Sequence, residues 1–172
     1  MSDTALSIRR AGPDDADAIA EVHVRTWQAA YEHVFGAERL AGVTVEQRLP
    51  MWRQILRDDE QTAFVAEGDA GIVGWCTVGP SRDTDADGEL WGIYVLPAAW
   101  GSRAGTALLA AGVDALRDSG CGEAILWVLE DNPRARRFYE REGWALDGGR
   151  KEDQFLGVTV AEVRYRKAVS DT

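Results

Sequence analysis

The chain has 172 residues, of which 45% are hydrophobic and 28% are charged, enough for one sizeable hydrophobic core and too few for two. Its 19 basic and 29 acidic residues give a net charge of −10, which disfavours nucleic acid or an anionic membrane as a partner. There is no pattern of a secretory signal and no apolar run of membrane-spanning length, and Cys76 and Cys121 lie far apart. These features predict a cytoplasmic protein without disulfides or a structural metal.

The first part of the chain predicts a strand, two helices and a hairpin. Residues 7–10 suit a short strand, and Pro13 suits the first turn of a helix whose apolar residues recur at helical spacing as far as Tyr31. A second helix is predicted from Thr44 to Arg57, after a loop over residues 36–42. Two apolar runs then flank a Gly-Asp-Ala-Gly turn at residues 68–71, which is typical of an antiparallel hairpin.

The second part alternates strands with helices. A strand from Glu89 to Pro97 leads into a helix over residues 103–118, an apolar strand follows at 123–129, and a short helix begins at Asn132. The end of the chain, TVAEVRYRK, alternates as a final strand. The acidic loop before Glu89 begins like a calcium loop, but Tyr94 stands where a bidentate acid is required. We therefore expect one mixed α/β domain over residues 7–170, with no metal.

Two stretches suggest binding of an extended ligand. The turn with Gly101 and Gly105 opens a helix, whose N-terminal N–H groups favour a phosphate, although the Rossmann and Walker patterns are absent. Taken alone, the two glycines also fit an ordinary helix entry. Asn132 and Tyr139 are seven residues apart, which places them on one helix face about 10.5 Å apart along its axis. Asn132 also suits a helix cap, and Tyr139 also suits the core.

This order of elements, with N-x6-Y followed by Glu-x-Gly-Trp, resembles the GNAT superfamily of acyl-CoA-dependent N-acyltransferases. The resemblance covers nearly the whole chain and is most specific between Glu89 and Gly143, while HVRTWQAAYEHVFG is similar to a common bacterial branch. It implies an α/β (α+β) fold, with a mixed, mostly antiparallel sheet of about six to seven strands, about four flanking helices and a splayed parallel strand pair that holds the coenzyme. It also implies transfer of an acetyl group from acetyl-CoA to a primary amine of an unidentified acceptor, without a metal. Family members are often dimers, so a homodimer is compatible with the resemblance.

The resemblance also implies which residues bind the coenzyme. The backbone of one strand would pair with the pantetheine arm, the turn would bind the pyrophosphate, and an asparagine would hydrogen-bond the pantetheine. The matching residues are Ile93, Tyr94 and Val95 in the strand, Gly101, Ser102, Arg103, Ala104, Gly105 and Thr106 in the turn, and Asn132. In the turn, Trp100 replaces the usual Gln or Arg, and Arg103 replaces a glycine. Arg103 either binds a phosphate directly or blocks the turn.

Catalytic roles follow from the same resemblance. Tyr139 matches the tyrosine that protonates the departing thiolate, and Glu89 occupies a strand position from which some members place a glutamate base. The alternative for Glu89 is a solvated acid at the start of a strand. Trp27 and Tyr31 either pack in the core or line the acceptor site, where a tryptophan face can receive a cation. The alternative to an enzyme is a non-catalytic acyl-CoA-binding or protein-interaction module on the same scaffold.

Overall fold

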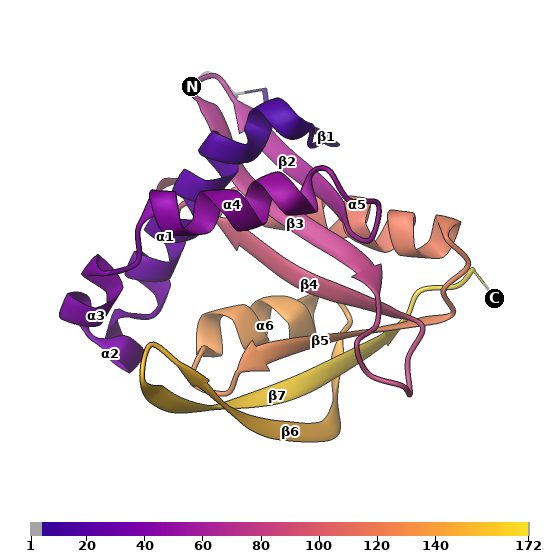
Figure 1. Ribbon diagram of the computed structural model, residues 1–172. Coiled ribbons are helices and arrows are strands. Elements are labelled where there is room, and N and C mark those ends of the chain that lie inside the picture. Colours follow the sequence, from indigo (N-terminus) through magenta and orange to yellow (C-terminus); the bar gives the residue numbers. More distant parts are fainter. Residues whose placement is uncertain (1–4, 172) are drawn as a thin grey trace.

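A computed structural model describes residues 5–171, and within them all the strands form one seven-stranded sheet (Figure 1). The strands lie in the order β1-β2-β3-β4-β5-β7-β6, and every neighbouring pair is antiparallel except β4 and β5. This confirms the predicted mixed, mostly antiparallel sheet with one parallel pair. The strands are β1 (Ser7–Arg10), β2 (Thr62–Gly68), β3 (Gly71–Pro80), β4 (Gly88–Val95), β5 (Glu123–Leu129), β6 (Ala145–Phe155) and β7 (Val158–Ala168).

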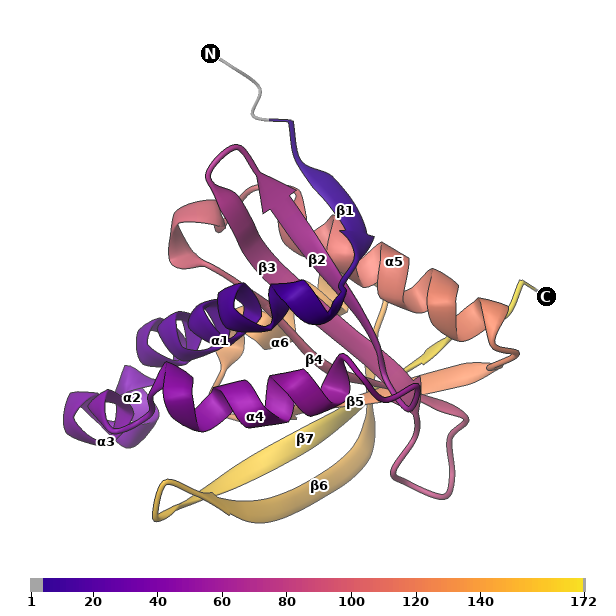
Figure 2. The ribbon, with the colours of Figure 1, turned by 45° about the horizontal axis from the view of Figure 1, so that its top comes forward.

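Helices cover both faces of the sheet (Figure 2). The helices α1 and α4 pack on one face of β2 and β3 through Val65, Trp75 and Trp52, and α5 packs on the other face through Leu108 and its neighbours. Where Gly112 of α5 packs on β3, a Cβ would lie 2.9 Å from the Val78 side chain and 3.0 Å from the Cys76 sulfur, so glycine allows the close packing there. The helices are α1 (Ala16–Ala30), α2 (Glu32–Phe35), α3 (Ala37–Ala41), α4 (Val45–Ile55), α5 (Ala104–Asp118) and α6 (Pro133–Arg141), with 3-10 turns at Pro13–Asp15 and Pro97–Ala99.

The strands β4 and β5 separate part of the way along the sheet. They are paired only from Gly88 to Leu90 on β4 and from Ala124 to Leu126 on β5. Beyond Leu90, a bulge at Trp91 interrupts the register of β4 with β3, and β4 and β5 diverge, with α6 beside the opening (Figure 1). One edge of residues 91–95 is therefore left without a partner strand, as the predicted splayed pair requires.

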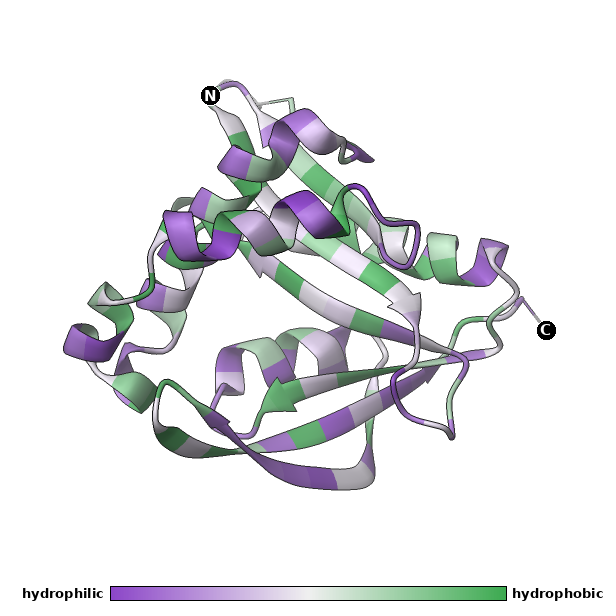
Figure 3. Ribbon diagram, viewed as in Figure 1, coloured by the Kyte–Doolittle hydropathy of each residue, from purple (hydrophilic) through white to green (hydrophobic). Residues whose placement is uncertain are grey.

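Two regions differ in detail from the elements expected from the sequence. Strand β6 was not anticipated because its residues are mostly polar, as Figure 3 shows, and mostly exposed, so that it lacks the alternation of a half-buried strand. The expected loop over residues 36–42 contains the short helix α3, preceded by α2. No helix within residues 5–171 is long and apolar enough to cross a membrane.

Candidate active site

A cavity of about 570 Å³ opens where β4 and β5 diverge. It is bounded by α1, β4, the start of α5, β5 and α6, with single residues from β6 and β7. Eleven of the sequence-predicted site residues line it together: Trp27, Tyr31, Ile93, Tyr94, Val95, Gly101, Ser102, Gly105, Thr106, Asn132 and Tyr139. Arg103, Ala104 and Glu89 do not.

The unpaired edge of β4 forms one wall of the cavity. Ile93, Tyr94 and Val95 line it, while their other edge is paired with Gly74, Trp75 and Cys76 of β3. An extended chain with amide groups can add to such an edge through main-chain hydrogen bonds. The shape and chemistry of this wall therefore suit a linear amide-containing ligand.

The turn before α5 forms the next wall. Gly101 has φ of +79°, a left-handed conformation that favours glycine, and the Ser102 hydroxyl accepts a hydrogen bond from the Ala104 N–H at 3.2 Å. Arg103 is exposed and stands at the N-cap of α5, whereas Ala104 is fully buried. Because Arg103 is not among the lining residues, it leaves the cavity open beside the N-terminus of a 15-residue helix.

Three arginines on α6 face the same region, although the chain as a whole is acidic. Arg134, Arg137 and Arg141 are spaced at i, i+3 and i+7 and all line the cavity. The guanidinium of Arg134 lies 3.8 Å from the centre of the Trp100 ring, and the Trp100 Nε1–H donates to the Val95 carbonyl at 2.7 Å. This part of the cavity is therefore suited to anionic groups such as phosphates.

Asn132 and Tyr139 face the cavity from one side of α6. The Asn132 side chain caps the helix by accepting a hydrogen bond from the Ala135 N–H at 3.2 Å, and its amide donates to the Tyr31 hydroxyl at 3.4 Å. The Tyr31 and Tyr94 hydroxyls lie 3.3 Å apart. Burial raises the pKa of Tyr139 well above its usual value, so its hydroxyl keeps its proton and can act as a donor.

The comparisons with known proteins agree with this geometry. The model of the Acetyltransferase (GNAT) family matches residues 17–144. The uncharacterized N-acetyltransferase YuaI of Bacillus subtilis is 32% identical over 131 residues, 74% of each chain. The chain belongs to the GNAT family.

Solved structures show the same fold at lower identity. PaiA N-acetyltransferase from Thermoplasma acidophilum in complex with coenzyme A superimposes with a TM-score of 0.74 at 17% identity, covering 95% of this chain and 99% of that one. The putative acetyltransferase YncA from Salmonella typhimurium, with its cofactor acetyl-CoA, has a TM-score of 0.71 at 20% identity, covering 98% and 96%. The GNAT resemblance drawn from the sequence is thus confirmed, and the chain is an enzyme of the N-acetyltransferase class.

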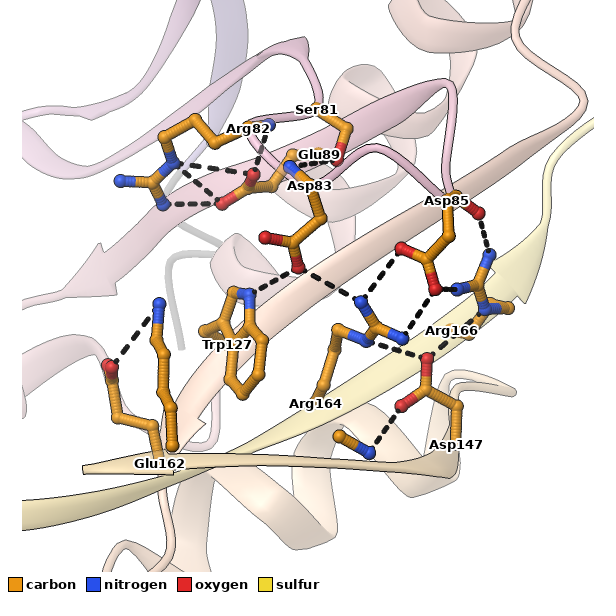
Figure 4. A network of polar contacts seen from close by, with 12 residues as sticks. Ser81, Arg82, Asp83, Asp85, Glu89, Trp127, Asp147, Glu162, Arg164 and Arg166 are labelled. Atoms are coloured by element: carbon orange, nitrogen blue, oxygen red, sulfur yellow. Dashed lines mark hydrogen bonds and ion pairs between the residues drawn. The ribbon is translucent and has the colours of Figure 1, made fainter.

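Glu89 lies elsewhere in this GNAT domain. Its side chain is fully buried and is bound by Arg82 through both the guanidinium and the backbone N–H, the latter at 3.0 Å (Figure 4). It is therefore not a solvated acid, and it does not line the cavity in which a base would meet the amine. The ion pair between Arg82 and Glu89 connects the loop before β4 to β4 itself.

Sequence reasoning missed two kinds of site residue. The α6 arginines were not singled out, although their spacing on the helix that carries Asn132 and Tyr139 was a usable signal. Glu162 of β7 was also missed, because it stands in an ordinary alternating strand. It lines the cavity, as do Trp127 and Phe155.

Proposed function

We propose that this GNAT enzyme transfers an acetyl group from acetyl-CoA to a primary amine by direct attack of the amine on the thioester. The proposal rests on one observation: the unpaired edge of β4 and Tyr139 of α6 line the same cavity. A donor extended along β4 can thereby bring its thioester to Tyr139.

The lining residues fit coenzyme A along its length. The β4 edge at Ile93–Val95 supplies main-chain partners for the pantetheine amides, with the Asn132 side chain facing the same space. The N-terminus of α5 and the three arginines of α6 supply N–H groups and positive charge for the phosphates. The coenzyme A and acetyl-CoA complexes of PaiA and YncA support this assignment.

The reaction requires a neutral amine and a proton for the leaving group. An alkyl ammonium has a pKa of about 10.4, so it must lose a proton before its lone pair can attack the thioester carbon. As the C–N bond forms and the C–S bond breaks, the coenzyme thiolate takes the proton of the Tyr139 phenol. The nitrogen then gives its second proton to the phenolate, which restores Tyr139. No covalent acyl-enzyme is needed, and holding the two reactants together supplies much of the rate.

A thermal-shift titration tests the coenzyme part of the proposal. Acetyl-CoA at a hundred times its Kd should stabilise the protein by about 2.7 kcal/mol, and ATP at the same concentration should not. Free-thiol release from acetyl-CoA in the presence of a panel of primary amines then tests transfer. Absence of any shift at millimolar acetyl-CoA would contradict the proposal. A saturable shift without thiol release for any amine would favour a non-catalytic acyl-CoA-binding module.

A further inference from the structure

We propose that Glu162 and the aromatic rings beside it bind the ammonium group of the acceptor, and that Glu162 removes its first proton. The inference rests on the proposed acetyl transfer and names the class of its acceptor, a cationic primary amine on an apolar or aromatic body. Among the carboxylates of residues 5–171, only that of Glu162 belongs to a residue lining the cavity.

The position of Glu162 in the sheet places it beside the opening between β4 and β5. It pairs with Leu129 at the end of β5, away from the point where β4 and β5 are still joined. Its side chain is only 14% exposed, and the rings of Trp27, Tyr31, Trp127 and Phe155 line the same cavity. A carboxylate and aromatic rings that line one cavity suit an ammonium group, because both attract a cation.

An ammonium group already lies against this carboxylate and ring. The Lys151 Nζ, from the strand β6 position opposite Glu162, is 3.7 Å from the carboxylate and 4.2 Å from the centre of the Trp127 ring. Lys151 is the cation paired with the Glu162 carboxylate, and its own side chain is 41% exposed. Because the contact is long and the lysine is partly in water, the ion pair is weak, and a substrate ammonium can replace the lysine.

The Trp127 ring is held in place before any acceptor arrives. Its Nε1–H donates to the Asp83 carboxylate at 3.0 Å, and Arg164 binds the same carboxylate oxygen at 3.0 Å (Figure 4). Arg164 is in turn fixed by Asp85 and Asp147 at 2.8 Å each. The network in Figure 4 thus attaches the acidic loop before β4 to β6 and β7 and preorganises one wall of the ammonium site.

The surroundings of Glu162 also suit a proton acceptor. Burial raises the pKa of its carboxyl, and Asp153 raises it further, while Lys151 and Arg82 lower it. The nearby Tyr31 phenol, from the C-cap of α1, is neutral because burial raises its pKa. A carboxylate with a raised pKa is a better match for an ammonium proton than an ordinary one. Glu162 takes one proton from the ammonium and releases it to water after the C–N bond has formed, while Tyr139 returns to its starting state.

Different elements supply the two charges of the cavity lining. The three arginines come from α6, and Glu162 comes from β7. This separation helps to orient the two substrates, because the arginines attract phosphates and repel an ammonium group, whereas Glu162 does the reverse.

Phenethylamine and the uncharged 2-phenylethanol are suitable probes, with variants Glu162→Gln and, as control, Glu152→Gln. Glu152 is an exposed carboxylate on β6 that does not line the cavity. We expect Glu162→Gln to weaken binding of phenethylammonium at least tenfold, measured by calorimetry, and to leave 2-phenylethanol and acetyl-CoA binding unchanged. Glu152→Gln should match the wild type throughout.

The pH profile of thiol release separates proton removal from a structural role. The acidic limb of kcat/KM for phenethylamine should disappear in Glu162→Gln and persist in Glu162→Asp at a lower rate. Equal affinity of wild type and Glu162→Gln for phenethylammonium, or no preference of the wild type for the cation over 2-phenylethanol, would overturn the inference. Failure of the wild type to bind acetyl-CoA would instead refute the proposed function, and the ammonium-binding comparison would still decide the role of Glu162.

Discussion

Replacing Tyr139 with phenylalanine should separate catalysis from folding. The substitution removes one oxygen and keeps the ring, which contacts Phe138 and Trp144 at centroid distances of 5.5 and 6.5 Å. No group within residues 5–171 hydrogen-bonds the Tyr139 hydroxyl, so the free energy of unfolding should change by less than about 1 kcal/mol. Tyr139 is only 7% exposed, so water has little access to protonate the leaving thiolate in place of the phenol. We therefore expect kcat to fall by about a hundredfold to ten-thousandfold.

Tyr165→Phe is the matched control on the same core cluster. Tyr165 is fully buried, its hydroxyl donates to Glu140 at 2.8 Å and accepts from Arg136 at 3.1 Å, and it does not line the cavity. Losing these bonds should cost about 1–3 kcal/mol of stability, at about 2–4 °C of Tm for each kcal/mol, while kcat is retained.

The assay for both variants combines thermal melts, acetyl-CoA binding and thiol release with an amine from the panel. We expect opposite outcomes for the two variants: Tyr139→Phe should be stable and inactive, and Tyr165→Phe should be less stable and active. Wild-type kcat in Tyr139→Phe would show that the phenol is not the proton donor. Equal losses of kcat in both variants would show that the effect comes through the fold of α6.

Three further predictions concern charge. Lowering the pH from 7 to 5 should destabilise the fold by about 2 kcal/mol through His23. Burial lowers its folded pKa from 6.5 to about 4, so the unfolded chain takes up a proton that the folded one excludes, and urea titrations of His23→Gln should lack this part of the slope. Lys151→Met should move the acidic limb of the pH–rate profile to higher pH, because the lysine holds down the raised pKa of Glu162. Arg137→Gln should weaken acetyl-CoA binding about tenfold and flatten its salt dependence in calorimetry, whereas the exposed Arg53→Gln on α4 should not.

Local patterns in the sequence were sufficient for most of the fold. Pro13, the Gly-Asp-Ala-Gly turn and the Asn132 cap each mark a boundary through the backbone conformation they favour, and the structure has an element boundary at each. Strand β6 was not predicted, because backbone hydrogen bonds pair it with β7 while most of its side chains face water. Its sequence therefore lacks the hydrophobic alternation that indicates a strand.

The sequence predicts those site residues that local spacing brings together. It does not predict those that only tertiary contacts bring together. Asn132 and Tyr139 share a helix face by spacing alone, so the sequence brings them together. The side-chain direction of Glu89 could not be extrapolated from Ile93, because the bulge at Trp91 interrupts the alternation of β4. Glu162 reaches the cavity only because β7 pairs with β5 along the opening, a register that no local pattern encodes.

A crystal structure with acetyl-CoA tests the central claim most directly. We expect the pantetheine arm to pair with the free edge of β4 and the phosphates to lie between the start of α5 and the α6 arginines. The thioester sulfur should lie within hydrogen-bond reach of the Tyr139 hydroxyl. Coenzyme bound outside the opening between β4 and β5, or with its sulfur remote from Tyr139, would contradict it.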